Sequence, residues 1–302
     1  MYMLNYDQEQ KIVEIGNVKI GGQPGENPTA MIATVFYAKH AALLDEKTGK
    51  IDKDLVEKEL NDFSEIIEET KLQGIIDVVG AYSDALIKEC EFISEIVDYP
   101  FLVDGLNDES RIPAMKGLKE IGLIDRAILN SIDENTTEEN LNRLKEIGVK
   151  YAVLLTFSAK YIYPHQKIDF LKNELIPKVN KANINDFIVD TAVLDLPSIG
   201  INAETTRLIK SQFGIPSGFA PANAIFGWDF VKKFGDTPRC GAIASIMTYC
   251  VNAGSDFVLF GPIKFAKCVV PAISLISGIN SYYRKRILRK NVSEKTPLKK
   301  IF

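Results

Sequence analysis

The chain repeats one pattern eight times: a short apolar run, followed after a few residues by an amphipathic segment of helical period. The runs are rich in β-branched and aromatic residues and lack the alternation of a half-exposed strand, which is typical of parallel strands covered by helices. Eight such units in 302 residues predict an α/β fold, a closed (β/α)8 TIM barrel. An open nucleotide-binding sheet is not favoured, because neither G-x-G-x-x-G nor G-x-x-x-x-G-K-[ST] occurs.

We expect one domain over residues 1–302, with additions at both ends. Alternating apolar and polar residues around Gly16 and Asn17 predict a hairpin at about 11–22, which would plug the bottom of the barrel. The eight strands are expected at 31–37, 75–79, 101–104, 127–129, 151–155, 186–193, 215–220 and 256–260.

A basic tail occupies about 284–302. It holds eight Lys or Arg and one Glu, a local charge of +7 in a chain of net charge −4. We interpret it as a solvated, partly disordered end; the alternatives are docking to an acidic partner or to a membrane surface. No nucleic acid is expected, because no aromatic residues are interleaved with the charges.

The remaining composition excludes several classes of protein. No apolar run approaches the ~20 residues of a membrane-spanning helix, so peripheral association is the only membrane role left open. Two histidines are too few for a histidine-rich metal site, and no bound metal is expected. In a chain without a signal peptide we expect a cytoplasmic location and reduced thiols at all four cysteines, Cys90, Cys240, Cys250 and Cys268.

Polar residues stand where the predicted strands end. The carboxyl ends of barrel strands meet at one mouth, where active sites lie. One polar residue at such a place can simply cap a loop, but two carboxylates and two amides on separate strands favour a binding site. The residues expected at the mouth are Asp104, Asn130, Asp190 and Asn223, with Ser158 after strand five, Lys264 after strand eight and His40 after strand one, the last either lining the mouth or purely structural.

The chemistry of this set suits a flat heterocycle. Ionised carboxylates accept hydrogen bonds, whereas amides both donate and accept. The amino-pyrimidine edge of a pterin offers adjacent N–H donors to a carboxylate, and its carbonyl and ring nitrogens suit an asparagine. The mouth has little positive charge and no Gly-rich phosphate loop, so a phosphorylated sugar is not expected.

Four segments resemble the H subunit of tetrahydromethanopterin S-methyltransferase and its relatives, the methyltetrahydrofolate:corrinoid protein methyltransferases. They are residues 21–29 (GGQPGENPT), 36–40 (FYAKH), 130–132 (NSI) and 216–228, within a likeness that covers about 11–278. The resemblance implies a pterin-binding barrel, usually a homodimer. It would move a methyl group between N5 of a reduced pterin, tetrahydrofolate or tetrahydromethanopterin, and the cobalt of a corrinoid carried by a partner protein.

The resemblance also implies roles for individual residues. Asp104, Asn130 and Asp190 would hold the pterin ring, and Asn223 would reach toward N5. Ser158 stands where the family often has Asn. Because an unprotonated N5 would leave as an amide-like anion, a proton is needed there; Asn223 would stabilise the protonated state, and a network of water and Asp190 would bring the proton.

Three alternatives are kept. A barrel lyase or aldolase would form a Schiff base on Lys264. A dihydropteroate synthase would need a phosphate-binding lysine where Asn223 stands. A non-catalytic subunit would bind the pterin or the corrinoid protein and leave the chemistry to another chain.

Overall fold

Eight parallel strands form a closed barrel in the computed structural model, which describes residues 5–229, 233 and 235–301. This confirms the predicted (β/α)8 fold. In the order of their hydrogen bonding the strands are β10 (Asp186–Asp190), β11 (Ser217–Phe219), β12 (Phe257–Pro262), β3 (Ala30–Val35), β6 (Gln73–Gly80), β7 (Phe101–Gly105), β8 (Ala127–Ile132) and β9 (Tyr151–Leu155).

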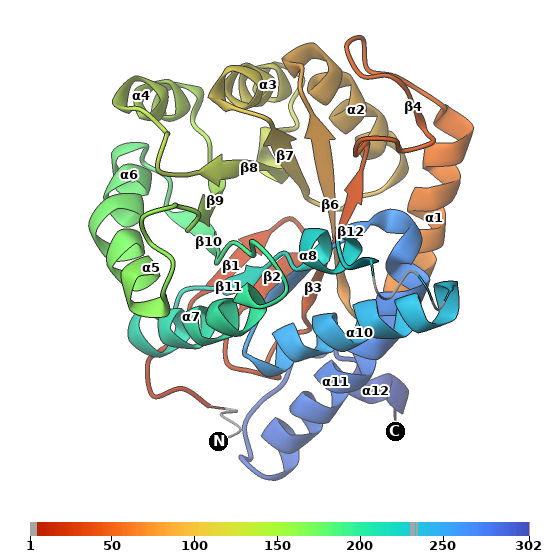
Figure 1. Cartoon of the computed structure of the whole chain (residues 1–302), viewed down its shortest axis with the longest axis vertical. Helices are drawn as coiled ribbons and strands as arrows, with labels where there is room; N and C mark the ends of the chain where they lie inside the picture. Colours follow the sequence, from red (N-terminus) through yellow and green to blue (C-terminus); the bar gives the residue numbers. More distant parts are fainter. Residues whose placement is uncertain (1–4, 230–232, 234, 302) are drawn as a thin grey trace.

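Helices surround the strands (Figure 1). The covering helices are α1 (Lys53–Thr70), α2 (Ser83–Ile96), α3 (Asp108–Glu120), α4 (Glu138–Ile147), α5 (Pro164–Phe170) continued through a π-helical turn (Leu171–Leu175) into α6 (Ile176–Lys181), α7 (Ser198–Phe213), α10 (Asp236–Asn252) and α11 (Ala266–Arg286). Shorter elements that the sequence did not predict are the hairpin β4 (Leu43–Asp45) and β5 (Lys50–Ile51), helices α8 (Ala222–Phe226) and α12 (Leu298–Ile301), and the 3-10 turns Ile124–Arg126 and Ile263–Phe265.

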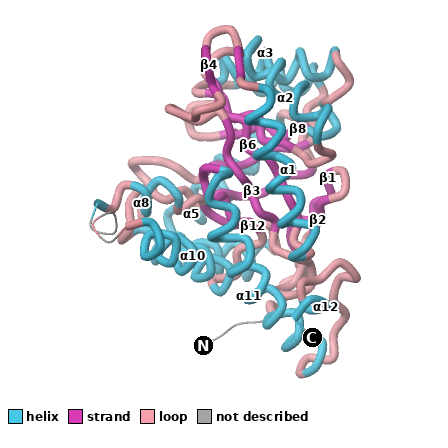
Figure 2. The backbone as a smooth tube through the Cα atoms, turned by 90° about the vertical axis from the view of Figure 1, so that its right-hand side faces the viewer, coloured by secondary structure: helices cyan, strands magenta, loops and turns pink. Residues whose placement is uncertain are grey.

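The N-terminal hairpin closes one end of the barrel. Its strands β1 (Ile12–Ile15) and β2 (Val18–Gly21) are antiparallel, and their inward side chains pack against apolar residues inside the barrel. Figure 2 shows this hairpin at one end of the barrel and helices α5 and α8 at the opposite end. Because the hairpin fills the bottom, the mouth at the carboxyl ends of the strands is left for a ligand.

The eighth barrel helix is long and apolar. Within the described residues the continuous helix Ile263–Arg286 is long and apolar enough to span a membrane by length and composition alone. Half of the most apolar stretch of this helix is buried, and α11 packs against α10 and α1. This packing is that of an outer helix of the barrel.

The C-terminal tail is ordered through residue 301, contrary to our interpretation of it as partly disordered. The Arg284 guanidinium donates to the carbonyl of Asn291 (2.8 Å) and pairs with Glu26 (3.1 Å). The Thr296 hydroxyl lies 3.2 Å from that of Ser281. The sequence pattern shows only the charge of the tail, whereas its anchors are uncharged groups and the ion pair between Arg284 and Glu26.

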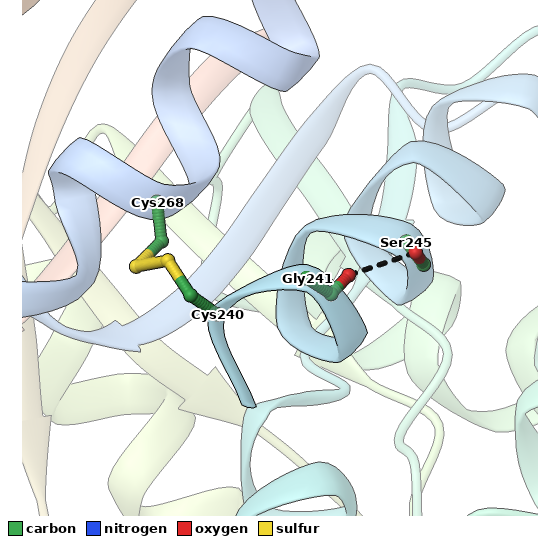
Figure 3. The surroundings of a disulfide bond; sticks show 4 residues. All are labelled: Cys240, Gly241, Ser245 and Cys268. Atoms are coloured by element: carbon green, nitrogen blue, oxygen red, sulfur yellow. Dashed lines mark hydrogen bonds between the residues drawn. A yellow bond between two sulfur atoms is a disulfide. The ribbon is translucent and has the colours of Figure 1, made fainter. Parts of the chain in front are cut away.

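Two of the four cysteines are joined, which corrects the expectation of four reduced thiols. Cys240 in the first turns of α10 forms a disulfide with Cys268 in α11 (Figure 3). Their Cα atoms lie 5.4 Å apart, within the range that a disulfide spans. Cys90 and Cys250 are free and buried, as predicted. Spacing along the chain does not reveal the pair, because it arises from the packing of two helices.

Candidate functional site

The interior of the barrel changes from apolar to polar at one level. Alternate residues of a strand point to the same side, so residues two positions apart share a face. An inward apolar layer consists of Ile32, Ile75, Leu102, Ile128, Val153 and Ile188. Two residues further along, toward the mouth, five of these six strands carry a polar residue, a set we call the polar layer: Thr34, Asp77, Asp104, Asn130 and Asp190.

Asp104 and Asn130 are neighbours in this layer. They are direct partners in the parallel register of β7 and β8, so both side chains leave their strands at the same height. Among the described residues no hydrogen-bond donor reaches the Asp104 carboxyl, although Arg111 is near enough for its charge to act on it. Burial raises the pKa of Asp104 to about 7, Arg111 opposes that rise, and the negative charge of Asp190 adds to it.

The Arg111 guanidinium fixes the wall behind Asp104. It lies 3.0 Å from the Asp108 carboxylate and 3.7 Å from that of Asp133, and it donates a long hydrogen bond of 3.4 Å to the Ser131 hydroxyl. Gly105 allows the Arg111 side chain to pass this close to the end of β7, because glycine has no Cβ. A Cβ at residue 105 would stand 2.5 Å from Cγ of Arg111, a contact that no side chain tolerates.

Asp190 is the last residue of β10 and closes the layer on the other side. Its Oδ1 accepts a 2.7 Å hydrogen bond from the backbone N–H of Ala192, which has the left-handed backbone conformation (φ 60°). Burial raises the pKa of Asp190 to about 6, while the Ala192 N–H and the charge of Lys167 hold it down. Among the described residues no hydrogen-bond donor contacts Oδ2 of Asp190.

Asp77 is the residue that sequence reasoning missed. It is 2 % exposed and accepts a 2.8 Å hydrogen bond from Thr34. Burial, followed by the charge of Asp104, raises its pKa well above the ordinary value, while the Thr34 hydroxyl and the nearby Asn130 amide oppose that rise. The signal is present in the sequence, because Asp77 follows Ile75 at the same interval as Asp104 follows Leu102. It stands inside an apolar run, however, and not at the end of one.

The loop after β9 lines a small pocket beside Asp190. Ser158 is buried, and its hydroxyl accepts a 3.1 Å hydrogen bond from the backbone N–H of Lys160. The pocket also takes in Lys167 and Asn202, with the aromatic side chains of Phe157 and Tyr161 at its edge. Ser158 thus lies next to the polar layer rather than within it.

Two predicted site residues lie outside the polar layer. Asn223 is exposed on α8, the short helix that follows β11, so it is carried by a helix and not by a strand end. His40 is 4 % exposed; its Nδ1 accepts from the Phe36 N–H (3.0 Å), and its Nε2 lies 2.9 Å from Glu59. Both ring nitrogens are engaged by the protein, which favours the structural of the two roles expected for His40.

No group of three or more His, Cys, Asp or Glu that could hold a metal occurs among residues 5–229, 233 and 235–301. What the layer does offer is free acceptor capacity on Asp104 and Asp190, an amide on Asn130, and three carboxyl groups whose pKa values are all raised by burial. Such a set can bind adjacent N–H donors and can hold or release a proton.

A family model for the MtrH subunit of tetrahydromethanopterin S-methyltransferase matches residues 8–291. The chain belongs to this family. The corresponding MtrH protein of Methanothermobacter thermautotrophicus is 32% identical over 284 residues, which cover 90% of this chain and 92% of that protein. The one from Methanocaldococcus jannaschii is 32% identical over 297 residues, covering 92% and 93%.

The MtrH membership confirms the resemblance found in the sequence and makes the chain a member of a methyltransferase family. Solved structures with the same fold include the dihydropteroate synthases of Yersinia pestis (TM-score 0.61, covering 90% of this chain and 99% of that one) and Xanthomonas albilineans (TM-score 0.58, covering 90% and 98%). Both are 12% identical to this chain, so they show the fold alone.

Proposed function

We propose that this chain is a methyltransferase that moves a methyl group between N5 of a reduced pterin and the cobalt of a corrinoid held by a partner protein. The observation that carries the proposal is the polar layer above an apolar floor. Asp104 and Asp190 have acceptor capacity that the described residues leave unused, and Asn130 presents an amide at the same level. The pterin of the named relatives is tetrahydromethanopterin, and we propose the same substrate here.

The layer fits the ring of a pterin. Its amino-pyrimidine edge presents adjacent N–H donors, which suit the carboxylates of Asp104 and Asp190. Asn130 can meet a ring carbonyl or nitrogen with the amide atom not turned to Asp77. The apolar layer beneath, which includes Leu102 and Ile188, limits how deep the ring can sit and keeps water from its lower side.

The chain's part in the reaction is to bind, to orient and to provide a proton. A reduced corrinoid supplies the nucleophile that takes the methyl group. Methyl loss from N5 requires a protonated nitrogen, and the carboxyl groups of Asp104 and Asp190, with pKa values of about 7 and about 6, can take up and release protons near neutral pH. Asn223, exposed on α8 at the mouth end of the barrel, is proposed to accept a hydrogen bond from the protonated N5. Oriented binding of two large reactants contributes on the order of 7–11 kcal/mol.

The mouth carries a collar of exposed apolar side chains, each in the connection that follows a barrel strand: Leu44, Tyr82, Leu106, Phe157, Ile162, Tyr163, Leu194 and Trp228. Large exposed apolar patches mark interaction surfaces. We propose that the corrinoid protein docks on this collar, because the methyl acceptor must come within bonding distance of a pterin held below it.

Further exposed apolar side chains lie on the adjacent helices α10 (Tyr249) and α11 (Leu275, Ile279 and Tyr282), and we call them the second apolar face. It lies on two outer helices, apart from the connections that form the collar, and we propose that a second copy of this chain covers it in a homodimer. A cytoplasmic location remains part of the proposal.

The experiment is methyl transfer by the purified chain. Methyl-tetrahydromethanopterin or methyl-tetrahydrofolate is mixed with cob(I)alamin and with a reduced corrinoid protein, and the cobalt absorbance is followed. We expect transfer from the methanopterin substrate without any further subunit. Binding of pterin without transfer to either acceptor would favour the non-catalytic subunit, and trapping of a carbonyl substrate by borohydride would favour the Schiff-base enzyme. Lys264 is exposed, with its ammonium 5.6 Å from the centroid of the Phe265 ring, which does not favour that lyase.

A further inference from the structure

Lys167 is a buried lysine that the proposed reaction does not use. It lies on α5, is 5 % exposed, and its ammonium donates to three oxygens from two other elements. The acceptors are the backbone carbonyl of Thr191, the backbone carbonyl of Ala192 (3.2 Å) and Oδ1 of Asn202 on α7 (2.8 Å). An ammonium has three N–H donors, so Lys167 is fully used inside the protein.

Two of these oxygens belong to the residues that directly follow Asp190. The same short turn therefore receives Lys167 on its carbonyls and directs the N–H of Ala192 to Oδ1 of Asp190 (2.7 Å). The turn is held in the left-handed conformation at Ala192, which is unfavourable for a residue with a Cβ. Asn202 is itself fixed, because its amide donates to the carbonyl of Ser198 (2.9 Å).

We propose that Lys167 is a positioning residue for Asp190: its ammonium holds the turn 190–192 so that one carboxylate oxygen is tied down, the other is left for the ligand, and the carboxylate is kept ionised. This rests on the proposed function only in identifying the ligand as a pterin. The electrostatic part of the claim concerns the protein alone.

The charges around the pair define what removal of the ammonium should do. Among the described residues Asp190 is the one charged group that acts appreciably on Lys167, and burial lowers the pKa of Lys167 to about 8. Asp190 faces Lys167 on one side and the carboxyls of Asp104 and Asp77 across the barrel. Nearby, the Tyr161 hydroxyl donates a 2.7 Å hydrogen bond to Glu174, which lies in the π-helical turn. Without Lys167, Asp190 keeps only acidic neighbours, so it should hold its proton to higher pH.

The first measurement is ligand-free. Aspartate labelled with carbon-13 at Cγ is incorporated, the Asp190 signal is identified by its loss in Asp190→Asn, and the carboxyl shift is titrated. In Lys167→Met we expect the Asp190 midpoint to rise by about one pH unit or more, the usual effect of losing a close opposite charge. In Lys167→Arg, which keeps the charge, the midpoint should stay within about half a unit of wild type. Equal midpoints in wild type and Lys167→Met overturn the inference.

The second measurement is the affinity for methyl-tetrahydromethanopterin between pH 5.5 and 9. We expect Lys167→Met to bind about 3-fold or more weakly at pH 6.5 and to approach wild type at pH 9, while Lys167→Arg follows wild type at pH 6.5. The ratio of variant to wild-type affinity cancels the titration of the ligand. A loss that is the same at every pH, and equal in the two variants, means packing alone and overturns the inference. If wild type binds no pterin, the proposed function fails while the carboxyl titration still decides the role of Lys167.

Discussion

Thr34 on β3 donates a 2.8 Å hydrogen bond to the buried carboxyl of Asp77 on the adjacent strand β6. The second carboxyl oxygen of Asp77 is buried with no hydrogen-bond partner among the described residues. An ionised carboxylate there would place a poorly solvated charge close to Asp104 and Asp190, so the neutral acid is the stable form. The barrel therefore folds around at least one bound proton at the level of the polar layer.

This proton predicts how stability depends on pH. An acid whose pKa is raised by folding stabilises the folded state below its unfolded pKa, and the stabilisation is lost as the pH rises through the folded pKa. Those folded values are about 6 for Asp190 and about 7 for Asp104, and the pKa of Asp77 is also raised. Urea unfolding should therefore show a free energy of unfolding that falls from about pH 5 to 8.

Asp77→Asn tests the same point, because the amide has the shape of the neutral acid and cannot ionise. It should lose less stability than wild type as the pH rises. Asp186→Asn, at the exposed opposite end of β10, is the matched control and should keep the wild-type slope. A wild-type stability that does not change between pH 5 and 9 would contradict the proton-bound cluster.

Asp104→Ala and Asp190→Ala should each weaken pterin binding by about 2–3 kcal/mol, the range for a hydrogen bond to a charged group. Asp186→Ala removes a carboxylate from the same strand as Asp190 but at the closed end of the barrel, and it should leave the affinity unchanged. Calorimetric titration with methyl-tetrahydromethanopterin measures all three. Wild-type affinity in either mouth variant would remove that residue from the site.

Much of the barrel could be predicted because its strands carry the signal in their own residues. Strand β9 has the predicted bounds, and Phe101-Leu-Val-Asp104 and Phe187-Ile-Val-Asp190 place their acids in the same phase behind an inward Leu or Ile. Short apolar runs that end on a polar residue, joined by short loops, are enough to bring Asp104 and Asp190 to one level, since a closed parallel barrel aligns its strand ends.

What the sequence did not reveal depends on contacts between distant elements. Three features can be predicted only if the contacts between elements are known. They are the disulfide between Cys240 and Cys268, the folded C-terminal tail, and the contacts of the Lys167 ammonium with the turn after β10 and with α7. The sequence predicts Asn223 beside a strand end because β11 is expected to run to about 220; the strand stops at Phe219, and α8 begins after Pro221. Asp77 is a different case, because its two-residue phase is readable in the sequence itself.

The disulfide predicts a measurable loss of stability on reduction. It closes a loop with a sequence separation of 28, and a loop of that length corresponds to about 3–4 kcal/mol of unfolded-state entropy. Urea unfolding with and without a dithiol should show this difference. The double variant Cys240→Ser, Cys268→Ser should be as unstable as the reduced protein and should no longer respond to the reductant, because Cys90 and Cys250 are free. A dependence on reductant that persists in the double variant would assign the effect to other groups.

Asn223 should affect the rate of methyl transfer more than the binding of the pterin. It is exposed on α8, which is packed onto β12: a Cβ at Gly261 would stand 2.8 Å from Cβ of Ala222, and the Phe226 ring stacks on Phe265 at 4.8 Å. Asn223 is therefore held near the mouth by its helix, outside the polar layer. If it stabilises the protonated N5 only during transfer, Asn223→Ala should lower kcat about 10-fold or more with little change in pterin affinity, since an interaction made mainly in the transition state is lost.

Asn185→Ala, before β10 at the closed end of the barrel, is the control for a lost amide. Equal losses in kcat and affinity for Asn223→Ala would make it a binding residue, and an unchanged transfer rate would remove it from the mechanism.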